Sequence, residues 1–451
     1  MASGDEHRGE GDDYGDAATM GALRQLYAGY AWADVASLEP AAAAGRAVRG
    51  AATVQCVVAG GGTARFAAGL RRESVVDVAG VVSLPREPVR GTTHQLVEIQ
   101  VEKLHCISRA VSNLPISVED AARSEEDVAR AKAAGEQLVH VGQDRRLDYR
   151  VIDLRTAANQ AIFRVQCQVE NMPLSEGFVG IHTPKLIGGS SEGGAAVFKL
   201  DYNGQPACLA QSPQLHKQMA VCGGFERVFE VGPVFRAEGS DTHRHLCEFV
   251  GLDVEMVLRD HYSEVCEVVD RLFVAMFDHL NKNCARELEA IQRQYPFKPL
   301  KYLETTLRLD YDQGIRMLQE AGVHVDPMGD LNTYDTEFYM LCRYPSAARP
   351  FYTMPCSDDP RYSCSFDVFV RGEEIISGAQ RVHAPELLVA QAEARGIDVR
   401  TIAAYIDSFR SGAPPHGGFV VGLERVVMLF CGLGNIRKTS LFPRDPRRLA
   451  P

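Results

Sequence analysis

The sequence lacks the features that would place the chain in a membrane, outside the cell or in an organelle. Its 451 residues contain no apolar run of about 18 residues, the length that a membrane-crossing helix needs. The N-terminal stretch MASGDEHRGEGDDYGDAA is acidic. A signal peptide needs a basic and then an apolar stretch, and an organelle transit peptide avoids acidic residues. We therefore expect a cytoplasmic protein that does not enter a membrane.

The sequence also lacks paired cysteines. It has 12 cysteines, none in a CxxC pair, and their scatter fits neither a zinc ribbon nor the disulfide framework of a secreted protein. We interpret them as reduced thiols, most of them small core residues.

The sequence also has fewer basic than acidic residues. The formal net charge is -11, which argues against a surface coated in basic residues for nucleic acid. It does not exclude one local basic patch, because the local field matters more at a contact than the total charge. The length allows two or three domains, each with its own core.

Composition changes along the chain and suggests four regions. Residues 1–45 are acidic or Ala-rich and are predicted to be a disordered extension. Three Val- and Ile-rich runs follow, with a short helix (Ala64–Leu70) after the first, and these resemble part of a small β-barrel within residues 46–118. The strand-like runs are Ala52–Ala59, Ser74–Val82 and Gln95–Ile107. Residues 119–148 are charged and helix-prone and are interpreted as a hinge.

Residues 149–451 have the pattern of a mixed α+β domain. Apolar residues recur at helical spacing over Tyr262–Leu280, which predicts an amphipathic helix. The stretch Ala384–Phe409 is predicted to form two helices broken near Gly396, and FVVGL (Phe419–Leu423) a short strand.

Three segments carry the chemistry. The first, Phe235–Met256, reads FRAEGSDTHRHLCEFVGLDVEM and is predicted to be a hairpin whose polar loop presents cations. Arginine suits a phosphate because its planar fork donates two parallel hydrogen bonds. An ordinary solvated loop is the alternative for this segment, although its charged residues are unusually dense.

The second segment, Gly417–Asp445, places a Gly-bearing strand before a helix with Arg425 near its start. Glycines allow a ligand to approach the backbone, and a helix N-terminus favours anions.

The third segment, Ser365–Arg381, is SFDVFVRGEEIISGAQR. If one strand continued through this segment, Asp367 and acids near Glu374 could converge with Ser377 and Arg381, because residues two apart share a face of a strand. Such oxygen ligands, with a neighbouring phosphate, are how Mg²⁺ is usually held. An amphipathic strand ending in a charged turn is the alternative.

Taken together, these segments resemble the signature motifs of the class II aminoacyl-tRNA synthetases, and most closely the aspartyl-tRNA synthetases of the eukaryotic cytosolic type. FRAE…THRHLCEF is similar to motif 2, and GLERVVM with the terminal TSLFPRDP is similar to motif 3. GFVGIHTPKL is similar to the end of motif 1, and AQSPQLHKQM, RPFYTMP and GAPPHGG also match the family. The resemblance extends from about residue 70 to the C-terminus.

The resemblance implies a fold. It predicts an α+β class II catalytic domain, an antiparallel sheet flanked by helices, over residues 149–451. An oligonucleotide-binding (OB-fold) β-barrel that binds the anticodon would precede it, in shortened form, over residues 46–118.

The resemblance also implies roles for site residues. Arg236, Arg425 and Glu374 would be catalytic, with Arg236 on the ATP α-phosphate and the substrate carboxylate, and Phe249 and Arg425 on either side of the adenine. The ATP site as a whole would comprise Arg236, Glu238, Arg244, His245, Leu246, Phe249, Glu374, Gly422 and Arg425. Mg²⁺ would be bound by Asp367, Glu374 and Ser377.

For the amino acid, the resemblance implies that Lys217 and Arg381 pair with the side-chain carboxylate of L-aspartate. Glu192 would lie in a loop that closes over the substrate. The full set implied for aspartate is Glu192, Ser212, Gln214, Lys217, Arg236, Asp253, Ser377 and Arg381. A neutral or cationic substrate would leave two cations unpaired, so discrimination can be large.

Three departures from the family pattern affect tRNA recognition, dimerisation and packing. Only three strands are evident in the barrel, against about five in an OB-fold, and no aromatic residue lies between Trp32 and Phe66 to stack on an anticodon. Pro173 falls soon after the expected start of the motif 1 helix that builds the family's homodimer, and a mid-helix proline breaks a helix. A further shortening lies near Asp330–Tyr339.

The leading hypothesis is therefore a ligase that joins L-aspartate to tRNA(Asp) through an aspartyl-adenylate, with ATP and Mg²⁺. One alternative is a binding or regulatory protein that keeps the ATP and aspartate pocket without charging tRNA. Another is a relaxed enzyme that also charges the asparagine tRNA.

Overall fold

The computed structural model describes residues 14–16, 31–35, 38, 45–48, 53–110, 112–170, 177–188, 196–320, 322, 337–410 and 413–450. The chain divides into two compact units, Met1–Ser117 and Val118–Pro451. The predicted hinge, residues 119–148, belongs to the second unit.

The first unit contains one sheet of six strands in the order β1-β6-β5-β3-β2, with β4 also paired to β6. Its elements are β1 (Tyr14–Asp16), β2 (Ala31–Asp34), β3 (Gly45–Val48), β4 (Gln55–Val57), α2 (Gly61–Gly69), β5 (Val75–Ser83) and β6 (Glu98–Ser108). Buried Leu38, Val82, Val97 and Ile99 form its core.

The sequence-based prediction for this unit was partly wrong. The three expected strands and the helix between them are present as β4, β5, β6 and α2. The sheet has three further strands, and β1 and β2 lie inside the stretch predicted to be disordered. They are only three and four residues long and rich in Ala, Gly and Asp, so they lack the β-branched alternation that marks a strand. The rest of residues 1–45 lies almost wholly outside the described residues.

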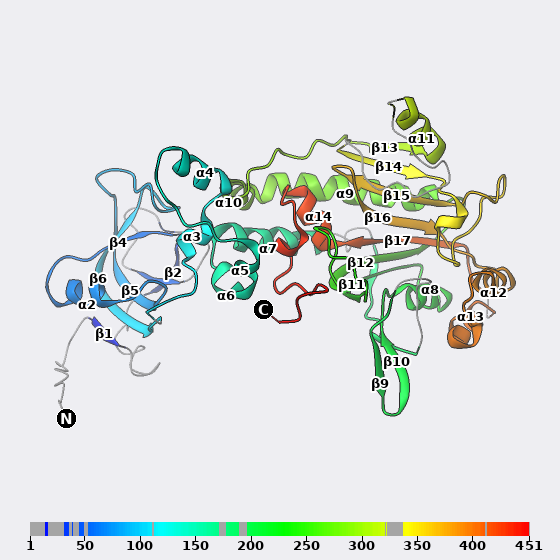
Figure 1. Ribbon diagram of the computed structural model, residues 1–451, viewed down its shortest axis with the longest axis horizontal. Helices are drawn as coiled ribbons and strands as arrows, with labels where there is room; N and C mark the ends of the chain where they lie inside the picture. The colour runs from blue at the N-terminus through cyan, green and yellow to red at the C-terminus, as the bar shows by residue number, and fades with distance from the viewer. Residues whose placement is uncertain are drawn as a thin grey trace. The chain divides into compact units, whose positions relative to one another are not determined.

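The second unit is built on an eight-stranded sheet in the order β13-β14-β15-β16-β17-β12-β11-β7 (Figure 1). Pairing is antiparallel from β14 through to β11 and parallel only at the two edges. This confirms the predicted antiparallel sheet flanked by helices. The strands of this sheet and of a small second sheet (β8, β9 and β10) are β7 (Val179–Gly180), β8 (Leu186–Ile187), β9 (Lys199–Tyr202), β10 (Gln205–Leu209), β11 (Arg227–Phe235), β12 (Glu248–Val257), β13 (Leu307–Asp310), β14 (Phe338–Cys342), β15 (Ser365–Val370), β16 (Glu373–Gln380) and β17 (His416–Gly422).

Helices of the second unit cover the sheet or extend from its ends. The α-helices are α3 (Val118–Ala122), α4 (Glu125–Ala133), α5 (Gln143–Asp148), α6 (Arg150–Asp153), α7 (Ala157–Glu170), α8 (Gln214–Cys222), α9 (Ser263–Asn283), α10 (Ala285–Gln294), α11 (Tyr311–Glu320), α12 (Pro385–Ala394), α13 (Ala403–Arg410) and α14 (Leu423–Phe430). Short 3₁₀ helices are η3 (Ser346–Ala348), η4 (Val399–Ile402) and η5 (Ile436–Lys438). The predicted long helix is confirmed as α9, and the predicted helix pair as α12 and α13.

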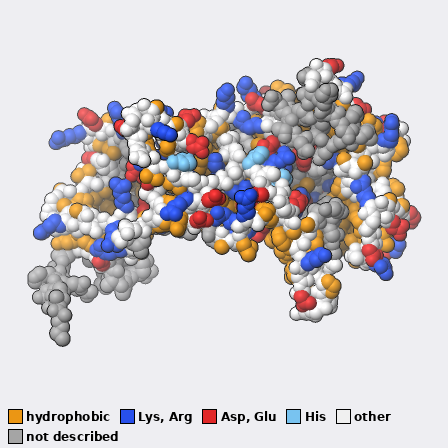
Figure 2. Space-filling view, in the orientation of Figure 1, with side chains coloured by type: hydrophobic (Ala, Val, Ile, Leu, Met, Phe, Trp, Pro, Cys, Tyr) orange, Lys and Arg blue, Asp and Glu red, His pale blue; other side chains and the backbone are white. Residues whose placement is uncertain are grey.

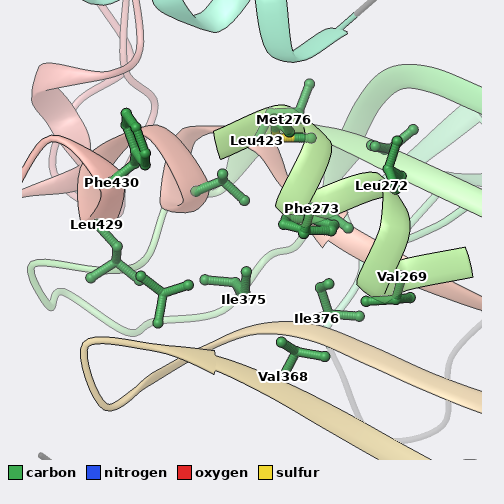
Figure 3. Close-up of a cluster of buried hydrophobic side chains, with 14 of the residues drawn as sticks. Val269, Leu272, Phe273, Met276, Val368, Ile375, Ile376, Leu423, Leu429 and Phe430 are labelled. Carbon is green, nitrogen blue, oxygen red and sulfur yellow. The ribbon is translucent and has the colours of Figure 1, made fainter. Parts of the chain in front are cut away.

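The main core lies between α9, α14 and the sheet. The helix α9 buries one apolar stripe at helical spacing, which includes Val269 and Phe273. Figure 3 shows these side chains beside Ile376 of β16 and Val368 of β15. This packing fixes β15 and β16 from one side, so the polar residues that these two strands carry are held on a rigid support.

The motif 1 helix is longer than the position of Pro173 suggested. The described part of helix α7 runs for 14 residues, from Ala157 to Glu170. The prediction that this proline interrupts the helix near its start was therefore wrong, because the helix begins well upstream of the expected point. Pro173 itself, and the shortened segment near residue 330, lie outside the described residues.

The surface of the second unit carries both signs of charge, interspersed over the face drawn in Figure 2. Among the described residues, no helix combines the length and the apolar composition needed to cross a bilayer.

Candidate active site

The cation-bearing loop lies at the end of a regular hairpin, as the sequence predicts. Strands β11 and β12 pair antiparallel from Arg227↔Met256 to Phe235↔Glu248. Beyond the last pair, the backbone N–H of Arg236 donates to the carbonyl oxygen of Cys247 at 2.8 Å, so the two limbs stay together at the base of the loop.

The loop itself is held by a residue from the C-terminal segment. The buried Arg437 guanidinium donates to the Asp241 carboxylate at 2.9 Å, to the Thr242 carbonyl oxygen at 3.0 Å and to the Asp445 carboxylate at 2.6 Å. Because these are charge-assisted bonds from one rigid planar group, they restrict the conformation of the loop. The terminal FPRD stretch therefore has a positioning role in this site.

All nine residues predicted for the ATP site line one cavity. Its walls come from the loop between β11 and β12 (residues 236–247) and from β12, β16, β17, α14 and η5. The lining residues are Arg236, Glu238, Arg244, His245, Leu246, Phe249, Glu374, Ile375, Ser377, Val420, Gly422, Glu424, Arg425 and Ile436. Glu424 has a structural task that the sequence did not indicate: its carboxylate accepts the Val250 backbone N–H at 3.0 and 3.1 Å, which ties α14 to β12.

Within the cavity, Arg236 combines a ring contact with an unsatisfied donor. Its guanidinium lies over the Phe249 ring, 5.5 Å from the centroid. Its Nε atom is buried and has no hydrogen-bond partner among the described residues. A buried donor without an acceptor costs free energy. An anionic ligand that accepted a hydrogen bond from this N–H would remove that cost.

Arg425, which also lines the cavity, is held by backbone oxygens. Its guanidinium donates to the carbonyl oxygens of Glu374 at 2.8 Å and Arg244 at 3.3 Å. Burial lowers the pKa of Arg425, and the Glu374 carboxylate opposes that effect. The pKa of His245 is also lowered, chiefly by burial and then by Arg425 and Arg244, so the cavity gathers cations around this imidazole.

A second polar centre lies further along the same strands. Lys217 of α8 is fully buried, and its ammonium is 2.9 Å from Asp253 and 3.7 Å from Glu255. Arg381 donates to the Glu255 carboxylate at 3.0 and 3.3 Å. Two cations and two carboxylates thus form one buried network, and they compensate one another as a buried charge cluster requires. Asp253 and Glu255 share a face of β12 because they are two residues apart.

The predicted aspartate ligands therefore have partners within the protein. The resemblance implied that Lys217 and Arg381 pair with the carboxylate of the substrate. In this structure Lys217 pairs with Asp253, and Arg381 pairs with Glu255. Burial is the main cause of a raised pKa at Asp253, with Lys217 opposing it. At Glu255 the combined attraction of Arg381 and Lys217 outweighs burial, and the pKa is lowered. Glu255 thus belongs to the buried charge network, although the sequence analysis did not name it.

The surroundings of the Glu255 carboxylate also include Gln214, Ser212 and Gly418. The Gln214 amide donates to its carboxylate at 3.3 Å, and the Gln214 backbone N–H donates to the Ser212 hydroxyl at 3.2 Å. A Cβ atom at Gly418 would collide with the Val254 carbonyl oxygen and would lie 2.5 Å from the Glu255 carboxylate. A glycine is therefore required where β17 passes the network. Glu192, the predicted loop residue, lies outside the described residues.

His416 extends this network towards α13. The Gln218 amide lies 2.9 Å from its Nε2, and its Nδ1 lies 2.8 Å from the Pro414 carbonyl oxygen. The Gln218 carbonyl accepts from the Tyr405 hydroxyl at 2.8 Å, so its amide nitrogen faces the imidazole. Nε2 is then the acceptor, Nδ1 carries the proton, and the ring is neutral. Burial lowers the pKa of His416, while the Glu255 carboxylate opposes this effect.

We predict that His416 contributes to acid unfolding. Its folded pKa lies below its unfolded value of about 6.5, so the unfolded chain binds the extra proton first. Stability is therefore fully present above about pH 6.5 and falls as the pH drops from there towards the folded pKa. His416→Gln should show a shallower decrease of Tm between about pH 7 and pH 5.5 than the wild type. His182→Gln, a change at an exposed site, should keep the wild-type slope; an equal slope in the His416 variant would contradict the prediction.

The proposed metal ligands lie on a hairpin rather than on one continuous strand, which corrects the sequence-based interpretation. The turn falls at Arg371 and Gly372, both with positive φ (49° and 79°), as a two-residue hairpin turn requires. Asp367 of β15 then pairs directly with Ser377 of β16. The convergence that was expected along one strand is thus achieved across two.

Arg349, which the sequence analysis did not include in the site, binds two of the three proposed metal ligands. Arg349 is buried and donates to both oxygens of Asp367, at 2.9 and 2.8 Å, and to the Ser377 hydroxyl at 2.9 Å. Its guanidinium also lies over the Tyr344 ring at 4.0 Å. Of the three predicted ligands, Glu374 and Ser377 line the nucleotide cavity and Asp367 does not. Within the described part of the chain, no three His, Cys, Asp or Glu side chains are grouped to hold a metal ion. Carboxylate and hydroxyl oxygens are nevertheless the donors that Mg²⁺ prefers, so the chemistry fits.

Comparison with known proteins agrees with this geometry. The family model described as tRNA synthetases class II (D, K and N) matches residues 142–446. A cytoplasmic aspartate–tRNA ligase 2 of Arabidopsis thaliana is 63% identical over 423 residues, covering 88% of this chain and 76% of the relative. The cytoplasmic aspartate–tRNA ligase of Homo sapiens is 50% identical, covering 88% and 83%.

Among solved structures, the aspartyl tRNA synthetase from Entamoeba histolytica superimposes with a TM-score of 0.88 at 38% identity, over 100% of this chain and 99% of that one. The family model covers more than half of the chain, and the relatives match along most of their length. The chain belongs to the class II tRNA synthetases of the D, K and N group and, within that group, to the aspartate–tRNA ligases.

Proposed function

We propose that the nucleotide cavity and the buried charge network form one active site, which makes aspartyl-adenylate from ATP and L-aspartate and transfers aspartate to tRNA(Asp). The overall activity follows from the family: the chain is an aspartate–tRNA ligase that releases AMP and pyrophosphate. Its relatives are named as cytoplasmic enzymes, and we assign this chain to the cytoplasm with them. What the proposal adds is the role of each residue.

The observation that carries the proposal is the continuity of two strands between the two centres. Strand β12 carries Phe249 to the nucleotide cavity and Asp253 to the charge network, and four residues of strand span about 13 Å. Strand β16 carries Ser377 to the cavity, and Arg381 follows directly after its end. A nucleotide in the cavity and an amino acid on the network would therefore lie end to end along the same strands.

Adenylation requires the α-carboxylate of aspartate to attack the α-phosphate of ATP. We assign Arg236 to the charge that develops there, because its buried Nε has an unused N–H and its guanidinium is positioned by Phe249. Phe249 and Arg425 would enclose the adenine by stacking and cation–π contact. Arg244 and His245 would bind the distal phosphates, and Glu238 the nucleotide. No side-chain nucleophile is needed, since positioning and electrostatics supply the catalysis.

Substrate choice would rest on an exchange of partners in the charge network. We propose that the side-chain carboxylate of aspartate takes the contacts of Lys217 and Arg381, while its α-ammonium lies beside Asp253. Asparagine would bring no second carboxylate, so the buried cations would keep their internal partners and the exchange would not occur.

The experiment that tests this function is ATP–pyrophosphate exchange with aspartate, asparagine or no amino acid. We expect exchange with aspartate alone. Equal rates with asparagine would contradict the assignment of the two cations, and exchange without charging of tRNA(Asp) would favour the impaired regulatory protein. Charging of the asparagine tRNA would support the relaxed enzyme. The impaired alternative has no specific observation in its favour, because the predicted ATP-site residues come together in one cavity.

We also propose that Mg²⁺ binds at Glu374 and Ser377, with Asp367 held beside them through Arg349. The metal would neutralise phosphate charge on the bound nucleotide. Glu374→Gln should raise the Mg²⁺ concentration for half-maximal exchange by at least about 10- to 100-fold, because that is the loss of metal affinity seen when even an outer-shell partner of a metal ligand is removed. The neighbouring Glu373→Gln, which removes a carboxylate bonded to His243, is the matched control. An unchanged Mg²⁺ dependence in the Glu374 variant would contradict this assignment.

We infer a homodimer built on the motif 1 region, as in the resembling enzymes. In support, β7 forms the edge of the large sheet, and Val179 on it is 49% exposed. An apolar residue on an open sheet edge favours a partner. Native mass spectrometry should give twice the mass of one chain, and Val179→Lys should shift the mass towards the single chain. A wild-type monomer at micromolar concentration would contradict the inference.

We propose, finally, that the first unit binds the anticodon of tRNA(Asp), with residues 119–148 as the hinge and residues 149–451 as the catalytic domain. Three strands of the six-stranded sheet, β4, β5 and β6, lie within residues 46–118 and support a role for this region as part of an OB-type module. Deleting residues 1–117 should leave adenylate formation in place and weaken tRNA charging.

A further inference from the structure

Two cysteines face each other across a short hairpin beside the catalytic sheet. The limbs of this hairpin are joined by the bridge between Pro355 and Ser363, and the backbone N–H of Cys364 donates to the Met354 carbonyl oxygen at 2.9 Å. The Sγ atoms of Cys356 and Cys364 are 3.8 Å apart, and the Cys364 thiol donates to the Cys356 sulfur. The two sulfurs are therefore already in van der Waals contact.

The two thiols are chemically unequal. The hydrogen bond from Cys364 is the largest cause of a lowered pKa at Cys356, and the positive charge of Arg343 adds to it. The same hydrogen bond is the largest cause of a raised pKa at Cys364, with burial second. An accepting sulfur that is stabilised as thiolate, next to a protonated thiol, is the arrangement of a nucleophilic and a resolving cysteine.

Access distinguishes this pair from a second one nearby. Cys266 and Cys342 also share a thiol–thiol hydrogen bond, but Cys266 lies on α9 with 1% exposure inside the main core. The turn of the other hairpin, at Ser357 and Asp358, is exposed, and Cys364 is partly exposed. Cys356 itself is buried, with 6% exposure, so a small polar oxidant would approach the pair from the side of the exposed turn and the partly exposed Cys364.

We propose that Cys356 and Cys364 are a redox-active dithiol that peroxide converts reversibly into a disulfide. The Cys356 thiolate attacks one oxygen of hydrogen peroxide, the O–O bond breaks, and with one proton the products are a sulfenic acid and water. The Cys364 thiol then attacks the sulfenic sulfur, a second water leaves, and the S–S bond forms. Two thiols lose two electrons in total, and peroxide takes them up.

Closing the bond requires the sulfurs to approach from 3.8 Å to about 2.05 Å, which the exposed turn can accommodate. The limb that carries Cys356 also carries Thr353, which pairs with Arg381 of the charge network. The other limb leads into β15 and Asp367. The disulfide would thus form between the elements that hold the amino-acid and metal residues. In a reduced chain such as this one, a disulfide of this kind is transient rather than structural.

The test uses the full, reduced chain treated with hydrogen peroxide at native pH, then alkylated, digested and analysed by mass spectrometry. We expect a cross-linked pair of peptides, lighter by two hydrogens than the reduced pair, which disappears after dithiothreitol. Cys364→Ser should leave a sulfenic acid at Cys356 that dimedone traps, because the resolving thiol is gone. Cys266→Ser, which changes a thiol of the other pair, should form the cross-link at the wild-type rate.

Two outcomes would overturn the proposal. One is that Cys356 and Cys364 both remain open to alkylation after the partly buried Cys222 and Cys247 have been oxidised. The other is that Cys356 proceeds to sulfinic acid in the wild type without a cross-link, which would mean that Cys364 does not act as the resolving thiol. Because both are read from the folded wild-type chain, neither depends on whether a variant folds.

Discussion

Arg236→Ala is expected to reduce aspartate-dependent ATP–pyrophosphate exchange by at least about 10²- to 10³-fold, the loss seen when one donor to a developing oxyanion is removed. The physical reason is the buried Nε–H of Arg236, which has no acceptor among the described residues, on a guanidinium that lies over the Phe249 ring. The effect should fall mainly on kcat, since the contact strengthens as charge develops in the transition state. Steady-state exchange kinetics at varied ATP and aspartate measure it.

The matched control for Arg236 is Arg293→Ala. Arg293 is an exposed arginine of α10 that pairs with Glu289 within its own helix. Its loss should leave exchange within about twofold of the wild type, because an exposed pair contributes less than about 1 kcal/mol. Undiminished exchange in folded Arg236→Ala protein would remove this residue from the mechanism.

Lys217→Met is expected to affect both folding and substrate choice. Methionine keeps the volume of the stem but leaves Asp253 without its buried partner, which should cost about 3–5 kcal/mol of stability. For the reaction, kcat/KM for aspartate should fall about 100-fold, because truncating one member of a buried charge pair costs roughly 2–5 kcal/mol. The KM for ATP should change little, since Lys217 does not line the nucleotide cavity.

A double variant separates these two effects of Lys217. Asp253→Asn combined with Lys217→Met removes both charges, so part of the lost stability should return. Aspartate binding should not return, because the cation remains absent. Equal changes in KM for ATP and aspartate in the single variant would show that the residue acts only through folding.

The nucleotide cavity could be predicted from the sequence because its residues lie in a few local segments. Motif 2 supplies both limbs and the loop of one hairpin, and motif 3 supplies one strand and the helix that follows it. Spacing within each segment therefore places Arg236, Phe249 and Arg425 relative to their own backbone. Only the family resemblance could bring the segments together, because the antiparallel pairing of β12 with β17 joins residues far apart in the sequence.

The pairing of charges could not be predicted in the same way. Lys217 and Arg381 were identified as cations for a substrate, but their partners in the folded chain depend on packing between α8, β12 and β16. The signal for Glu255 was present in the two-residue spacing from Asp253 on a strand. Arg349, by contrast, has no local signal, because its contact with Asp367 depends on where the segment before β15 folds back.

The first unit shows a different limit. Its long strands β5 and β6 are rich in Val and Ile and were found, whereas β1 and β2 are too short and too poor in β-branched residues to differ from a loop. Their pairing depends on the existing edge of the sheet rather than on their own composition.

The most direct measurement of the central claim is aspartate-dependent ATP–pyrophosphate exchange on the purified chain, followed by aspartylation of tRNA(Asp) on the same sample. We predict exchange that requires aspartate, together with charging of that tRNA. A well-folded chain that shows no exchange would contradict the account, because it would mean that the residues around the cavity and the charge network do not act as one site.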